Sequence, residues 1–174
     1  MTKELFQSEF FKKGIYYIGD LCYVMGNSSP LWDEFLKITE ETIDGQITNY
    51  ADGFYEFKGY KMGWHSTESG DGFYRASQAG SINNIASCPV DSGTIGIIPF
   101  SFIKMYNTQQ EVEEIMTCGI VHSFENDFEV TLSYNSDFGR IVVYTRADDE
   151  DEDEYDEWEE EEEENDEERD SDSE

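Results

Sequence analysis

The last 27 residues most constrain the fold of this chain, because they contain almost nothing that a core could bury. From Asp148 to Glu174 there are 21 acidic residues and one basic residue, Arg169. Like charges repel one another, and so little apolar surface does not offset the backbone entropy of about 1–2 kcal/mol per residue that folding costs. We therefore predict a disordered acidic tail at 148–174 and a folded domain at 1–147.

Two aromatic residues interrupt the acidic tail. Tyr155 and Trp158 are three positions apart, so both rings would lie on one side of a turn if a partner ordered the segment. A plainer interpretation is that the tail keeps the protein soluble and that the two rings are incidental. The net charge of the chain, −30 from 41 acidic and 11 basic residues, is compatible with both.

Residues 1–147 have the size of one domain with a single core. The chain has 12 Phe, 11 Tyr and 3 Trp, and glycines separate its short apolar runs, which is typical of strands and tight turns. No apolar run is long enough to cross a bilayer and no secretory signal pattern is present, so we expect an intracellular protein of the cytoplasm or nucleus. Cys22, Cys88 and Cys118 lack a Cys-x-x-Cys spacing and are interpreted as reduced thiols.

Capping signals predict two helices. Ser29 is expected to be the N-cap of the first helix with Pro30 as its first residue, and Thr108 with Glu111 forms a capping box for the second. The predicted buried faces are Leu31, Phe35 and Ile38 in the first helix, and Val112, Ile115 and Met116 in the second.

Apolar runs bounded by turn residues predict the strands. They are expected at 14–20, at 54–65 with bulges at Gly59 and Gly63, at 73–76, at 94–100, and as an antiparallel meander at 119–124, 128–134 and 139–145. The SGDG turn at 69–72 is expected to join the 54–65 and 73–76 strands as a hairpin. The sequence thus predicts a β-dominated α+β domain, built as an antiparallel, strongly bent sheet or small barrel with two short helices, and followed by the disordered acidic tail.

Three stretches of the chain resemble the signature motifs of one protein family. They are YIGDLCYVM at 17–25, SGDGFY at 69–74 and VDSGTIGIIP at 90–99. They are similar to the Gly-Asp-Pro-Cys-Tyr, Tyr-Gly-Asp-Gly-aromatic and Val-Asp-Ala/Ser-Gly motifs of a family of small uncharacterised proteins from phages, bacteria and large DNA viruses. Leu21 stands where the family has proline, and Ser69 where it has tyrosine. The resemblance covers residues 16 to about 100, does not include the acidic tail, and implies no particular activity.

Asp20, Asp71 and Asp91 each lie beside a glycine at the end of a predicted strand. Such a carboxylate either accepts hydrogen bonds from backbone amides of its own turn, which is the commoner role, or faces a common site that could bind a hard cation. No spacing matches an EF-hand loop, so no metal or cofactor is predicted. Asp91-Ser92-Gly93 is similar to the loop of aspartic proteases, but that chemistry needs two carboxylates that share a proton, and the chain has one such triplet.

Nucleophilic catalysis would have to combine a cysteine with His65 or His122. The chain offers little positive charge to lower the pKa of a thiol, so we interpret Cys22 as a buried thiol and His122 as a strand histidine, and we predict no catalytic residue. Trp64 and His65, beside Tyr60 and Tyr74, are candidates for an aromatic wall against a small ligand, although the same rings are also candidates for the core.

Two hypotheses about function follow. In the first, the protein is a non-enzymatic binding protein, and a viral or phage accessory protein or inhibitor if the motif resemblance holds, whose acidic tail engages a basic protein partner. Direct binding of nucleic acid is not expected, because it requires Lys and Arg to neutralise phosphates. In the second, Gly-Asp turn carboxylates bind, or help to hydrolyse, a small molecule, metal or nucleotide. The candidate ligand site then comprises Asp20, Trp64, His65, Asp71, Tyr74 and Asp91.

Overall fold

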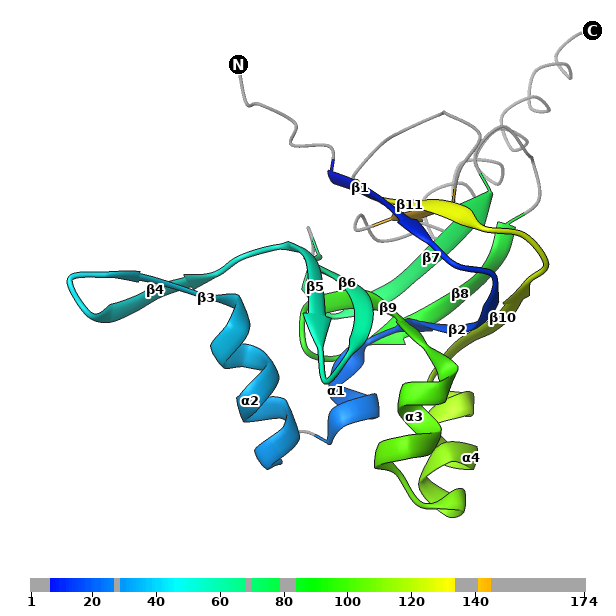
Figure 1. The fold of residues 1–174 in the computed structure, drawn as a ribbon, viewed down its shortest axis with the longest axis horizontal. Coiled ribbons are helices and arrows are strands. Elements are labelled where there is room, and N and C mark those ends of the chain that lie inside the picture. Colours follow the sequence, from blue (N-terminus) through cyan, green and yellow to red (C-terminus); the bar gives the residue numbers. More distant parts are fainter. Residues whose placement is uncertain (1–6, 27–28, 68–69, 79–83, 134–140, 145–174) are drawn as a thin grey trace, which may run out of the picture.

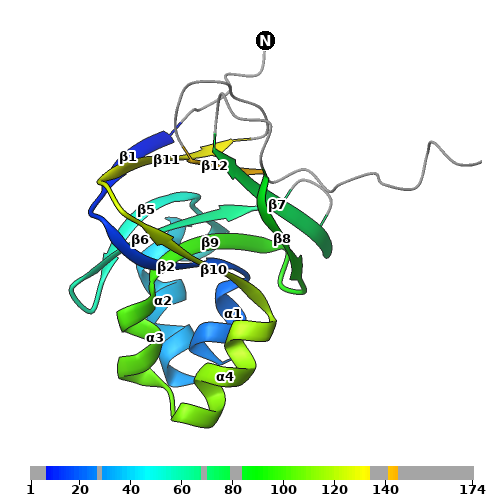
Figure 2. The same cartoon turned by 90° about the vertical axis from the view of Figure 1, so that its right-hand side faces the viewer.

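Two five-stranded sheets form the body of the molecule (Figures 1 and 2). The computed structural model describes residues 7–26, 29–67, 70–78, 84–133 and 141–144. The first sheet has the order β1 (Gln7–Phe11), β11 (Phe128–Ser133), β12 (Ile141–Tyr144), β7 (Gly72–Gln78), β8 (Asn84–Val90). The second has the order β10 (Gly119–Phe124), β2 (Gly14–Gly19), β9 (Thr94–Pro99), β6 (Tyr60–Ser66), β5 (Gly53–Phe57). Strand β8 contacts β10, and β1 contacts β5, so the two sheets close toward a barrel. The predicted β-dominated α+β class is confirmed.

Helices form a third layer on the outer face of the second sheet (Figure 2). They are α1 (Leu21–Met25), α2 (Pro30–Thr39), α3 (Phe100–Tyr106) and α4 (Gln109–Thr117). One apolar cluster fills the space between the sheets and includes Ile18 and Tyr74, and a second lies under the helices and includes Phe35 and Phe102. The described part of the chain therefore has four helices where the sequence predicted two, and none of them is long and apolar enough to cross a membrane.

The chain passes from one sheet to the other at a corner where two strands bend side by side. Strand β1 leads into β2, and β10, which pairs with β2, leads into β11, which pairs with β1. Stacked rings of Phe124 and Phe128, with centroids 3.8 Å apart, fill this corner. On the outer side of this corner, Asp127 accepts a 2.9 Å hydrogen bond from the amide of Lys13 and forms an ion pair with Lys12. These two partners lower the pKa of the Asp127 carboxyl.

Both predicted helix starts are confirmed. Ser29 caps α2 by accepting a hydrogen bond from the amide of Trp32, and Pro30 is the first helical residue. Thr108 and Glu111 form the reciprocal capping box of α4, with hydrogen bonds of 3.2 and 2.6 Å. Local side chains therefore satisfy the first free amides of both helices.

The predicted buried faces of these helices are partly wrong. Helix α2 buries Trp32, Phe35 and Thr39, whereas Ile38 is 44% exposed. Helix α4 buries Val112 and Ile115 as predicted, whereas Met116 is 45% exposed. The buried face of α2 is thus rotated by about one residue from the expected one, whereas that of α4 lies as predicted but is narrower.

Two glycine-rich stretches differ from the predicted strands. Residues 54–65 form a hairpin of β5 and β6 with Lys58 and Gly59 at its turn, both with left-handed φ angles of 52° and 81°. Gly63 pairs in regular register with Phe54, so it is not a bulge. The hairpin predicted around SGDG is wrong, because β6 belongs to the second sheet and β7 to the first, and Gly70 and Asp71 lie in the crossover between them.

The predicted C-terminal meander is also wrong. Strand β10 lies in the second sheet and β11 in the first, where β11 runs parallel to β12. A further hairpin, β3 (Glu40–Ile43) and β4 (Gln46–Tyr50), stands away from the body (Figure 1) and turns at Asp44 and Gly45, where the sequence had indicated only the end of the helical region. Residues 148–174, with Tyr155 and Trp158, lie outside the described residues, so the tail stays a prediction.

Candidate functional site

The three family-like motifs meet at one junction, and Asp20 lies at its centre. Asp20 is fully buried and caps α1 by accepting a 2.9 Å hydrogen bond from the amide of Cys22. The Ser92 hydroxyl donates a hydrogen bond of 2.7 Å to the same oxygen, and the other oxygen accepts hydrogen bonds of 2.8 and 2.7 Å from the amides of Asp91 and Ser92. Four donors thus satisfy this carboxylate, which ties the 90–93 turn to the start of α1.

The turn of the second motif lies against the same junction. The amide of Thr67 donates a hydrogen bond of 2.8 Å to the carbonyl of Gly93, and the Thr67 hydroxyl donates one of 2.6 Å to the carbonyl of Gly70. Gly93 and Gly70 both have left-handed φ angles, 70° and 73°, which suit glycine in tight turns. The sequence therefore identified three segments that do come together, and most of their contacts join a side chain to a backbone group.

The three aspartates take different positions at this junction. Asp20 is buried, whereas Asp71 and Asp91 are exposed. Asp91 accepts a hydrogen bond from the Tyr23 hydroxyl, and the pKa of Tyr23 is raised by burial and by this carboxylate. Among the described residues, no group of three or more His, Cys, Asp and Glu side chains is arranged to hold a metal ion. The hydrogen bonds of this junction thus serve to hold the three segments together.

The rings of the predicted aromatic wall point to different parts of the core. Trp64 is 2% exposed and packs under the helices against Phe35, with ring centroids 5.5 Å apart. Tyr74 is buried between the sheets, where its hydroxyl donates a 2.7 Å hydrogen bond to the carbonyl of Gly70. His65 follows Trp64 on β6 and so faces the other side, where its Nε2 lies 3.6 Å from Asp52. These residues do not line a common cavity.

The thiols are poorly suited to nucleophilic chemistry. All three cysteines are free, as predicted, and Cys22 and Cys88 are buried. Burial, reinforced by the nearby Asp20 carboxylate, raises the pKa of both Cys22 and Cys88 to about 12. A thiol with such a pKa is almost entirely protonated at neutral pH and is a poor nucleophile. Cys118 is half-buried at the end of α4.

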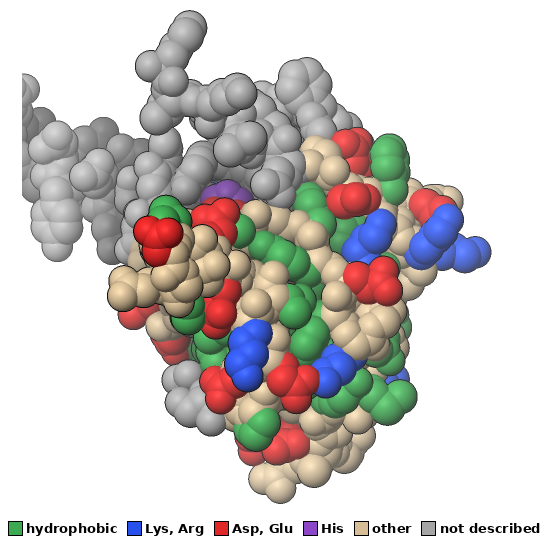
Figure 3. Space-filling view, turned by 60° about the vertical axis from the view of Figure 1, so that its left-hand side comes forward, with side chains coloured by type: hydrophobic (Ala, Val, Ile, Leu, Met, Phe, Trp, Pro, Cys, Tyr) green, Lys and Arg blue, Asp and Glu red, His purple; other side chains and the backbone are tan. Residues whose placement is uncertain are grey.

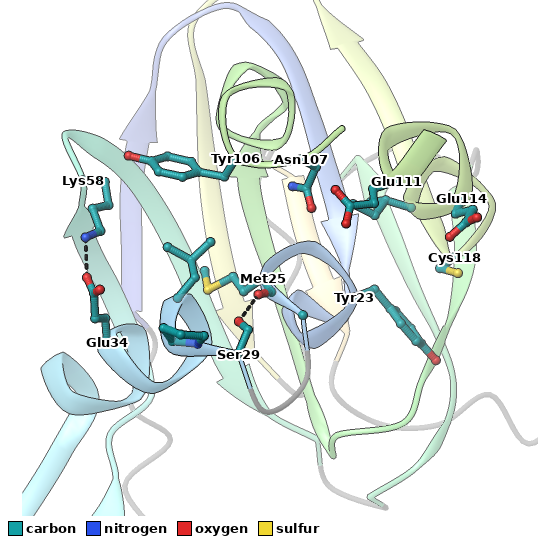
Figure 4. A pocket seen from close by; sticks show the side chains of 14 residues that line it. Tyr23, Met25, Ser29, Glu34, Lys58, Tyr106, Asn107, Glu111, Glu114 and Cys118 are labelled. Atoms are coloured by element: carbon teal, nitrogen blue, oxygen red, sulfur yellow. Dashed lines mark hydrogen bonds and ion pairs between the residues drawn. The ribbon is translucent and has the colours of Figure 1, made fainter. Parts of the chain in front are cut away.

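Residues of the four helices line a cleft (Figure 4). It is an open hollow of about 670 Å³. Its apolar floor includes Met25 from α1, Leu31 from α2 and Ile115 from α4. Tyr23 lines the cleft and also binds Asp91, so the cleft and the motif junction are connected through α1.

The rim of this cleft carries mainly negative charge. Figure 4 shows Glu34 and Lys58 at one end, joined as an ion pair, and Glu111 and Glu114 toward the other. The hydrogen bond to Glu34 raises the pKa of Lys58. Three glutamates thus surround the cleft, and the single lysine of its lining is already engaged with one of them.

Sequence analysis missed this cleft although it located several of its residues. The capping box identified Glu111, and the N-cap identified Ser29, which donates a hydrogen bond to the carbonyl of Met25. The lining comes from four helices and the β5–β6 turn, which are far apart in the sequence. No local pattern indicates that these segments meet.

Comparison of the chain with protein-family models, with curated proteins and with solved structures finds no match. The function must therefore be argued from the residues themselves. The motif resemblance agrees with a junction that joins the three motifs, but the family assignment stays an expectation.

Proposed function

We propose that this is a non-enzymatic binding protein that captures a basic protein partner through its acidic residues. The observation that carries this proposal is the distribution of charge: residues 148–174 hold 21 acids and one base, and the cleft among the helices also has an acidic rim. Charge of one sign attracts an oppositely charged partner, over about 8 Å at physiological ionic strength and farther at low salt, and raises the rate of association.

The arrangement of the basic residues supports a protein partner over nucleic acid. Lys12, Lys58 and Lys61 each pair with a neighbouring carboxylate, Asp127, Glu34 and Glu9 respectively. On the face drawn in Figure 3, Lys and Arg side chains alternate with acidic side chains and form no continuous basic patch. Binding to a phosphate backbone would require unpaired cations in a row, and such a row is not seen on that face.

The chemistry of the motif junction supports a role without catalysis. Asp20 uses both of its oxygens to accept hydrogen bonds, and the buried thiols stay protonated. The alternative, a ligand site at the Gly-Asp turns, would have to use the exposed carboxylates of Asp71 and Asp91, and substitution of these two residues tests it as described below.

The test compares the full chain with a variant of the same length in which Glu159 to Glu164 are replaced by glutamine. The probe is poly-L-lysine, and its dissociation constant is measured by fluorescence anisotropy at several salt concentrations. We expect the wild-type chain to bind with an affinity that falls steeply with salt, and the variant to bind several-fold more weakly at each salt concentration. Binding that is insensitive to both salt and neutralisation would contradict the proposal.

A further inference from the structure

The cleft combines an apolar floor with an acidic rim. Its floor contains the buried side chains of Met25 and Ile115 and the half-buried Leu31. Its rim contains Glu34, Glu111 and Glu114. An apolar floor with charged groups of one sign around it is complementary to an amphipathic ligand of the opposite sign.

We propose that this cleft docks a basic, amphipathic segment of the partner protein. An apolar side chain of the segment packs on the floor, and its Lys or Arg side chains approach Glu114 at one end and Glu34 at the other. The inference rests on the proposed function and deepens it: the tail attracts the partner by charge alone, and the cleft selects partners that carry an apolar residue between their bases.

Charge argues against occupants that come from this chain itself. The acidic tail would bring Tyr155 and Trp158 to the cleft together with their flanking acids, which Glu111 and Glu114 would repel. A second copy brings a net charge of −30 toward an acidic rim. The volume of about 670 Å³ holds a few side chains rather than the surface of a domain, so a short segment is the fitting ligand.

Helix α4 offers a matched pair of variants for the test. Glu113 and Glu114 are adjacent exposed glutamates, and each accepts a hydrogen bond from the glutamine four residues before it, Gln109 and Gln110 respectively. Glu114 lines the cleft and Glu113 does not. Glu114→Gln and Glu113→Gln therefore remove the same charge from the same helix, and they differ in whether that charge belongs to the cleft.

The experiment measures binding of an amphipathic probe to the full-length chain. The probe is a synthetic 14-residue helical peptide of Leu, Ala, Lys and Arg, and a version with serine in place of leucine has the same charge. We expect Glu114→Gln to weaken binding of the leucine peptide roughly two- to fivefold, as loss of an exposed ion pair does, and Glu113→Gln to change it less than about 1.5-fold. The serine peptide should bind about tenfold more weakly than the leucine peptide.

Lys58 provides a change in the opposite direction. Lys58→Asn removes the positive charge that forms an ion pair with Glu34. Asparagine tolerates the left-handed backbone at this turn position, where φ is 52°. We expect this variant to bind the leucine peptide roughly two- to threefold more tightly than wild type. Equal effects of Glu113→Gln and Glu114→Gln, or weaker binding by Lys58→Asn, would overturn the docking site.

Cys118 reports where the probe binds. It lines the cleft and is half-buried, whereas Cys22 and Cys88 are buried, so alkylation of the folded chain should occur first at Cys118. The leucine peptide should slow this alkylation at least threefold, and poly-L-lysine held by the tail should not. If the leucine peptide binds but does not slow alkylation of Cys118, it binds elsewhere, and the cleft is not its docking site. Binding of poly-L-lysine would still test the proposed function separately.

Discussion

Two groups of carboxylates lie within one helical layer of this protein, and burial separates their roles. At the motif junction, Asp20 is inaccessible to solvent and accepts four hydrogen bonds from backbone and side-chain donors. Around the cleft, Glu34, Glu111 and Glu114 are exposed and take part in ion-pair or helix-surface contacts. A buried charge must be satisfied within the fold and so determines structure, whereas an exposed charge remains available to a partner.

The largest effect should come from Asp20. Asp20→Asn keeps the shape but replaces one acceptor oxygen by a donor that faces a backbone amide, so we expect the free energy of unfolding to fall by about 2–4 kcal/mol. The matched exposed substitutions, Asp71→Asn and Asp91→Asn, should each cost less than about 1 kcal/mol. Urea denaturation of the three variants measures the difference. A mild effect of Asp20→Asn would contradict the structural role of this carboxylate.

The same exposed variants separate the two functions. Asp71→Asn and Asp91→Asn should leave binding of basic probes nearly unchanged, because the two residues lie outside the lining of the cleft. If either substitution abolished binding of a metal ion or nucleotide while the domain stayed folded, the Gly-Asp turn site would be supported instead.

Because Gly96 is closely packed against its neighbours, substitution of this residue should have the next largest effect on stability. A Cβ atom on Gly96 would lie 2.5 Å from the carbonyl oxygen of Gly63 and 2.7 Å from the Leu21 side chain. We expect Gly96→Ala to lower the free energy of unfolding by roughly 1–3 kcal/mol, since a neighbouring backbone cannot move aside. Gly45→Asn, in the β3–β4 turn where nothing lies within 4 Å, is the control and should cost less than about 0.5 kcal/mol.

Alkaline pH should weaken the junction before it affects the cleft. Cys22 and Cys88 have folded-state pKa values of about 12, against 9.0 for an ordinary thiol. Between these values the folded chain binds more protons than the unfolded chain, so stability falls as pH rises above about 9. We expect the melting temperature of the wild-type chain to drop by several degrees between pH 8 and pH 10.5. The melting temperature of Cys88→Ala, compared with its own value at pH 8, should drop by less. Parallel curves for the two proteins would refute this cause.

A modest effect is expected at Tyr23, which belongs to both regions. Tyr23→Phe removes the hydrogen bond to Asp91 but keeps the ring in the cleft, so it should cost about 0.5–1.5 kcal/mol. Binding of the leucine peptide should change less than about twofold. If the affinity for the leucine peptide fell by much more than twofold while the free energy of unfolding changed only within this range, the hydroxyl itself would contact the ligand.

Local signals predicted the parts of the fold that depend on neighbouring residues. The N-cap at Ser29, the capping box at Thr108 and strand β9 followed from patterns a few residues long. The short helix α1 was missed because Leu-Cys-Tyr-Val is equally compatible with a strand, and its N-cap, Asp20, looked like a turn residue.

Distant contacts explain what the sequence could not predict. Whether SGDG closes a hairpin or crosses between sheets depends on which partner β7 finds, and that partner is β8. The opposite orientations of Trp64 and His65 follow from the face that β6 turns toward the helices. The cleft needs five separate segments, so motif spacing carries no information about it.

The corner of paired strands also has a consequence for synthesis on the ribosome. Lys12 and Asp127, which meet at this corner, are 115 positions apart in the sequence. Strand β1 and one edge of β2 must therefore stay unpaired until β10 and β11 have emerged, for a time on the order of ten seconds at about 5–20 residues per second. During this interval the apolar face of β2 is exposed to chaperones and to other nascent chains, so substitutions that slow closure of the corner should reduce the yield of folded protein more than its stability.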